Sequence, residues 1–250
     1  MRNLRCLAAV ALFFPGLCTV ADAQMARPQF RPSVLRSGPE SLINTIDREA
    51  LSKAGQKDGA VMFSALVKKT GEVAQSRTYR GTPDTAALEA EVRKRLENVK
   101  FAPAIYNYQP VEVILSGTVF FAVADGKPQV RIFLNQDPNE LKKTSDFIAP
   151  QPVLGGDSQF TGVHYPTELT VQVKAVVDLG LNVDVTGHLR ELHVVAEEPP
   201  LLGFKNLAAK DFHGAKFIPA FRDGDAVESK TLYPVCYQPD DSDSAQPAAE

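Results

Sequence analysis

Two stretches of the chain alternate apolar and polar positions, as a strand with one buried face does. The alternating apolar residues are Val61, Phe63, Ala65 and Val67 in the first stretch and Val177, Leu179, Leu181 and Val183 in the second. A period of two places such residues on one face of a sheet. Each stretch therefore predicts a strand, and after a Thr-Gly turn a second strand is expected at 72–79 and at 188–195.

A helical pattern follows each predicted strand pair. Its apolar residues, spaced i, i+4, i+8 and i+11, are Leu88, Val92, Leu96 and Val99 in the first unit and Phe204, Ala208, Phe212 and Ala215 in the second. This spacing forms one face of a helix. Thr82 is the expected N-cap of the first helix, with Pro83 at its first position. After a Lys-Phe-x-Pro-Ala segment that ends each helix, a last strand is predicted at 111–123 and at 227–237.

The two units are copies of one sequence. Thr70-Gly71 lies 116 residues before Thr186-Gly187, and Lys100–Ala104 lies the same distance before Lys216–Ala220. Several separate matches on one diagonal, without a gap, indicate an internal repeat. The repeat predicts an α+β fold with two tandem modules. Each module is expected to be a three-stranded antiparallel sheet, in the order strand, strand, helix, strand, covered by one helix.

The residues outside the repeat set the expected domain boundaries. The first module is placed at 40–136, because an amphipathic segment precedes the repeat and a hairpin around Asp125-Gly126 follows it. The second module is placed at 163–239. Prolines and glycines between the modules predict a linker at 137–162, and the acidic residues 240–250 predict a disordered tail.

The N-terminus has the pattern of a secretory signal peptide. Two arginines precede an apolar run over residues 6–17, and Ala21-Asp22-Ala23 supplies small residues before a cleavage site. We expect residues 1–23 to be removed and the mature chain to be periplasmic in a Gram-negative-type envelope. A retained membrane anchor is the alternative, although the apolar run is shorter than the roughly 20 residues that span a bilayer.

Composition narrows the chemistry. A formal net charge of −3 gives no electrostatic case for binding nucleic acid or anionic lipid. Cys236 is the one cysteine outside the expected signal peptide, so we expect a buried residue in a strand, with an intermolecular disulfide as the alternative. The four histidines show no metal-ligand spacing, and no nucleophile elbow or phosphate loop is present. We therefore expect no enzymatic activity, cofactor, metal or small-molecule substrate.

The second unit resembles the C-terminal domain of the TonB family. The residues that carry the likeness are Tyr165-Pro166, Val177–Val183, Gly187, Pro199–Phe204, Lys216–Ala220, Gly224 and Tyr233–Tyr237. The first unit keeps the Gly turn, the helix pattern and Lys100–Ala104, but lacks the Tyr-Pro pair. The resemblance implies capture of a short strand from an outer-membrane transporter. Energy transducers of that family carry an uncleaved N-terminal helix and a long Pro-rich spacer, and this sequence shows neither pattern.

An open sheet leaves a strand edge that can pair with an extended peptide. We expect this edge at the last strand of the second unit, with Leu232, Tyr233, Val235 and Tyr237 as candidate binding residues, unless the linker or the other module covers it. The leading hypothesis is an exported protein-binding module that does not transduce energy. Its partner would be an envelope protein or a second copy. The alternative is a TonB-family transducer with a retained anchor, acting in outer-membrane transport.

Overall fold

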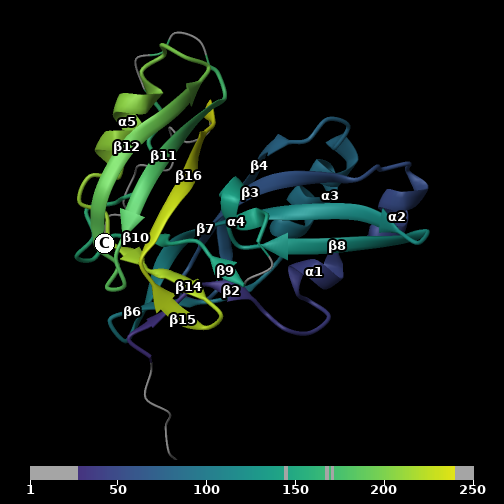
Figure 1. Ribbon diagram of the computed structural model, residues 1–250, viewed down its shortest axis with the longest axis horizontal. Coiled ribbons are helices and arrows are strands. Elements are labelled where there is room, and N and C mark those ends of the chain that lie inside the picture. Colours follow the sequence, from purple (N-terminus) through teal and green to yellow (C-terminus); the bar gives the residue numbers. More distant parts are fainter. Residues whose placement is uncertain (1–27, 144–145, 167–168, 170–171, 240–250) are drawn as a thin grey trace, which may run out of the picture.

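The computed structural model describes residues 28–143, 146–166, 169 and 172–239, so the expected signal peptide and acidic tail lie outside it. The fold is α+β with mainly antiparallel sheets, as the repeat predicts. Figure 1 shows the strands of the second module standing steeply beside those of the first. Among the described residues, no helix combines the length and apolar character needed to cross a membrane.

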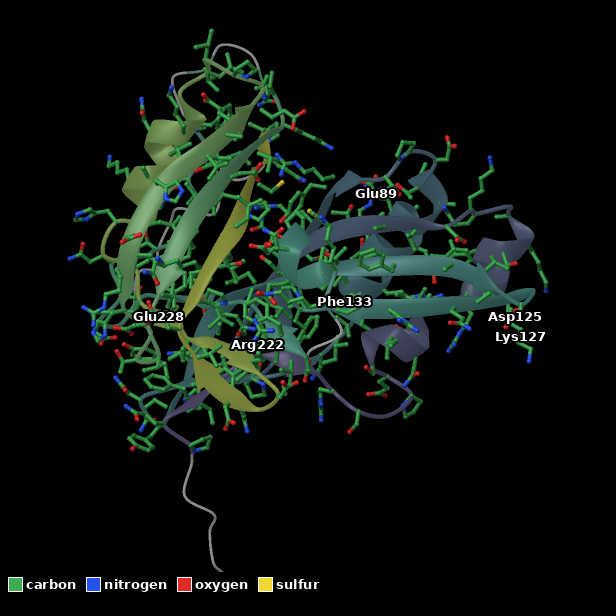
Figure 2. The ribbon with its side chains drawn as sticks, viewed as in Figure 1. Glu89, Asp125, Lys127, Phe133, Arg222 and Glu228 are labelled. Atoms are coloured by element: carbon green, nitrogen blue, oxygen red, sulfur yellow. The ribbon has the colours of Figure 1, made fainter. Side chains whose placement is uncertain are left out.

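The first module is built on four antiparallel strands in the order β4-β3-β7-β8, which belong to a larger eight-stranded sheet, and helix α3 packs on them. Its elements are α1 (Leu42–Thr45), α2 (Arg48–Lys53), β3 (Gly59–Val67), β4 (Val73–Gly81), α3 (Ala86–Leu96), β7 (Gln109–Ala124) and β8 (Lys127–Phe133). The β7–β8 hairpin confirms the expected extra strand, and its tip at Asp125 and Lys127 points away from the second module (Figure 2). The expected N-cap at Thr82 is wrong, because α3 starts at Ala86 and the Thr82 hydroxyl instead accepts the Ala60 amide at 3.0 Å.

The second module is a three-stranded antiparallel sheet in the order β12-β11-β16. Its elements are β11 (Ala175–Val183), β12 (Leu189–Glu198), α5 (Phe204–Asp211) and β16 (Ser229–Tyr237). The strand registers repeat with the sequence: Val61 pairs with Val119 in the first module, and 116 residues later Val177 pairs with Val235. The internal repeat is therefore a repeat of backbone pairing as well as of sequence.

The two repeated motifs contact each other in both modules. The Phe101 amide donates to the Gly71 carbonyl at 2.8 Å, and the Phe217 amide donates to the Gly187 carbonyl at 2.9 Å. Both glycines have positive φ, at +85° and +80°, and a Cβ on either would collide with the carbonyl of the phenylalanine it faces. Only glycine allows this turn to approach the end of the helix segment so closely.

A short two-strand arm precedes each module. In the first, β1 (Phe30–Arg31) and β2 (Val34–Leu35) pair with β6 (Ala104–Tyr106) and β5 (Phe101–Ala102). In the second, β9 (Phe147–Ile148) pairs with β14 (Ala220–Arg222), and β10 (Gln151–Leu154) pairs with β13 (Phe217–Ile218). Helix α4 (Pro138–Leu141) precedes this arm, and β15 (Asp225–Val227) pairs with β14 on its other side. Because β10 also pairs with β7, the described residues of the expected linker, 137–143 and 146–162, include strands that join the two modules.

Candidate functional site

The four residues expected to bind a partner strand lie on β16, which is an edge strand of the second sheet. Tyr233, Val235 and Tyr237 point into the core and are only 4%, 2% and 0% exposed. Leu232 is half-buried. The structure therefore places three of the four side chains where a partner could not contact them.

The middle of the backbone edge of β16 is closed as well. The Leu232 amide donates to the Asp137 carboxylate at 2.8 Å, and the Thr231 hydroxyl donates to the same oxygen at 3.3 Å. Residues of an antiparallel strand alternate in which edge their backbone faces, so residue 234 would present the next outward amide. Pro234 has no N–H to present. The structure thus argues against β16 as an acceptor edge, because the segment between the modules covers it.

Polar groups line the contact between the modules. The Ser116 hydroxyl donates to the Tyr233 hydroxyl of β16 at 3.4 Å, and Arg80 forms an ion pair of 2.6 Å with Asp178 of β11. Within the first module, the Tyr79 hydroxyl donates to Gln136 at 2.6 Å. Burial, reinforced by the neighbouring Cys236 and Tyr233, raises the pKa of Tyr79 well above its usual range, which keeps its hydroxyl protonated as a donor. The cavity left between the modules is only about 90 Å³, against roughly 300–1,000 Å³ for ordinary ligand pockets.

The opposite edge strand, β12, is open. Among the described residues it pairs only with β11, and it lies on the side of its sheet away from the first module (Figure 1). On β16 the Leu232 amide faces away from β11, so Leu232 and its β11 partner Gly180 are not hydrogen-bonded to each other. Gly180 therefore directs its backbone N–H and C=O toward its other partner, His193 on β12. Leu192, the next residue, then directs its N–H and C=O outward. Register shifts at Asp178/Leu179 and at Asn182/Val183 interrupt the pairing with β11, so within the first half of β12 the regular open edge is the stretch from Glu191 onward.

A groove of about 460 Å³ lies between this first half of β12 and the last turns of α5. Its apolar lining consists of Leu189, Leu192, Ala209 and Ala215. Its polar lining consists of His188, Arg190, Glu191, His213 and Lys216. Beyond the groove, the Glu197 carboxylate accepts the Leu201 amide at 3.2 Å and the Lys205 amide at 3.4 Å, which ties β12 to the start of α5.

The turn before β12 is held rigidly at the mouth of the groove. The Asp184 carboxylate accepts the Thr186 amide at 2.8 Å and the His188 amide at 3.0 Å, and it pairs with Arg190 at 2.6 Å. Burial by itself would raise the pKa of Asp184, but the hydrogen bonds from Thr186 and His188 and the charge of Arg190 outweigh it and hold the pKa far below its ordinary value. A permanently charged Asp184 fixes Arg190 at the rim.

At the corresponding edge of the first module, β4, a strand side chain is tied to the helix. Thr78 stands 116 residues before Val194, and its hydroxyl donates to Glu89 of α3 at 3.0 Å. Thr78 is 7% exposed. α3 has eleven residues where α5 has eight. The two modules therefore share a fold but differ in the helix side chains that lie beside the edge strand.

Sequence reasoning missed this groove, although one substitution between the repeats points to it. Ala209 stands where the first module has Arg93, so α5 lacks a long side chain beside the strand. Comparison with protein-family models, curated proteins and solved structures found no match to this chain. Within the part of the chain that the structure describes, no group of histidine, cysteine and acidic side chains could hold a metal ion. The groove beside β12 is therefore the feature of this chain that bears on its function.

Proposed function

We propose that this chain is an exported protein-binding module that captures an extended segment of a partner by strand addition to β12. One observation carries the proposal: the outward backbone groups of an edge strand lie directly beside a groove of about 460 Å³ with an apolar floor. In strand addition, backbone hydrogen bonds supply affinity, and pockets for alternate side chains supply specificity. Leu192 offers the first, and the space beside Ala209 and Ala215 offers the second.

The rest of the molecule supports a binding role of this kind. The polar interface between the modules, with the Ser116–Tyr233 and Arg80–Asp178 contacts, ties them together and leaves β12 on the outside. The N-terminal sequence pattern supports export to the periplasm, where the partner would be an envelope protein or a second copy of this chain. Strand addition at β12 needs no energy transduction and no cofactor.

Peptide display tests the proposal. Random peptides are selected on the purified protein, and the binders are then titrated against two variants of α5. Ala209→Trp fills the groove and is expected to weaken binding at least tenfold. Asn206→Trp places the same bulk outside the groove lining and is expected to leave binding unchanged.

A second variant tests the backbone. Leu192→Pro removes the outward N–H without removing a bond to β11, so it is expected to abolish binding while the fold persists. Amide chemical shifts should move at Leu192 and Val194 when a peptide binds. Peptides that bind Ala209→Trp as well as the wild type, or that shift only the amides of β16, would refute strand addition at β12.

A further inference from the structure

We infer that the β12 groove selects partner segments that carry an acidic side chain, and that Lys216 binds the carboxylate of that side chain. The inference rests on the proposed function, because it names the kind of segment that the same groove would take. Its basis is a difference between the two copies of the repeat at one pair of facing residues.

The first module has an ion pair of its own at this place. Glu72 and Lys100 face each other across an isolated antiparallel bridge, and their side chains form an ion pair of 3.0 Å. The Thr70 hydroxyl donates to the same carboxylate at 3.3 Å. The hydrogen bond and the charge of Lys100 lower the pKa of Glu72 below its ordinary value. The lysine that follows the first helix is thus neutralised within its own module.

The second module keeps the cation and lacks the carboxylate. His188 and Lys216 form the equivalent bridge 116 residues later, so a histidine stands where the first module has Glu72. Among the described residues, no carboxylate lies within ion-pair distance of Lys216. Lys216 is half-buried, whereas Lys100 is exposed. The more buried of the two lysines is therefore the one that has lost its acidic neighbour.

The other charges around Lys216 do not replace that neighbour. Asp184, in the adjoining turn, pairs with Arg190 at 2.6 Å and lies 3.8 Å from His188. Glu191 is the single carboxylate of the groove lining, and it stands three residues beyond His188 on β12. A half-buried cation gains more from an anion than an exposed one does, because less water screens the attraction. The groove therefore favours a carboxylate that a partner supplies.

The strand register predicts where this carboxylate lies in the partner. An added strand pairs with β12 through the outward backbone groups of Leu192. Lys216 is bridged to His188, which stands four residues before Leu192. At about 3.3 Å per residue of strand, the acidic side chain is expected about four positions away from the partner residue that faces Leu192. Charge at one fixed position would give the groove specificity as well as affinity.

The test is a double-mutant cycle on the full-length protein with peptides selected by display. These peptides are expected to share Asp or Glu at one position, and changing it to Asn or Gln should weaken binding to the wild type about tenfold. On Lys216→Gln the acidic and amide peptides should bind within about twofold of each other. Lys210→Gln removes a cation of α5 that does not line the groove, so this matched control should keep the full difference.

The cycle separates the inference from the proposed function. Peptides that Ala209→Trp weakens but that share no acidic position would overturn the inference and leave strand addition at β12 intact. An acidic preference that persists unchanged in Lys216→Gln would also overturn it, because the carboxylate would then bind elsewhere.

A measurement without any selected peptide keeps the inference testable if strand addition itself fails. The probe is acetyl-glutamate amide, and acetyl-glutamine amide at the same millimolar concentration is its neutral match. The acidic probe is expected to shift the amide signals of Gly187 and Lys216, and the neutral probe to leave them in place. Equal shifts from both probes, or no shift from either, would overturn the inference.

Discussion

Asp137→Ala tests the closure of the β16 edge most directly. One carboxylate, on a residue only 5% exposed, accepts the Leu232 amide at 2.8 Å, the Thr231 hydroxyl at 3.3 Å and the Asn139 amide at 2.7 Å. It thereby connects the segment between the modules to the last strand of the second module. Removing it leaves the Leu232 amide at the module interface without its acceptor.

The expected cost follows from these contacts. A hydrogen bond to a charged group contributes about 1.5–3 kcal/mol, and the two short bonds count most. Water can reach the half-buried Leu232 and recover part of the loss, so we expect the free energy of unfolding to fall by about 3 kcal/mol. For a chain of this size, each kcal/mol lowers Tm by roughly 2–4 °C, which gives a decrease of about 6–12 °C.

Urea unfolding and amide exchange measure the effect. Asp137→Asn is the control, because its amide oxygen can still accept one of the bonds, and it should cost only about 1 kcal/mol. Exchange at the Leu232 amide should accelerate in the Ala variant much more than exchange in the core of β3. If the Ala variant loses less than about 1 kcal/mol, or no more than the Asn variant, the carboxylate does not close this edge.

Three further changes test other parts of the argument. Gly71→Ala should lower the free energy of unfolding in urea by about 3 kcal/mol, because the added Cβ collides with the Phe101 carbonyl. Gly126→Ala is the control: its φ is similarly positive but the site is open, so it should cost only about 1 kcal/mol. Asp184→Asn should lower stability at pH 7. Since the folded-state pKa of Asp184 is depressed, its contribution is present above about pH 4 and is lost as the pH falls through the folded-state pKa, so the wild type and the variant should converge in acid unfolding measurements. Tyr165→Phe should cost about 2 kcal/mol in thermal unfolding, because its hydroxyl both donates to the Val173 carbonyl and accepts the Val173 amide at 2.8 Å, and an unchanged Tm would contradict this role.

The module fold could be predicted from the sequence because its determinants are local and repeated. Alternation along β3 and β11 and the helical spacing along α3 and α5 are properties of short windows, and each unit presents both. The offset of 116 residues then placed equivalent strands in equivalent registers. The start of α3 was misplaced because the Thr82 hydroxyl is used by β3, a contact from 22 residues earlier in the chain.

Local residue patterns were enough to specify the module: strands, helix, turn glycines and their order. The accessibility of each strand edge came from packing in three dimensions. The Leu232 amide of β16 is taken up by Asp137, which stands 95 residues earlier in the chain, while β12 pairs among the described residues only with β11 and has Ala209 of α5 beside it. Periodicity records whether a residue faces a core, but the exposure of a backbone edge depends on contacts between segments far apart in sequence, and no local pattern encodes those.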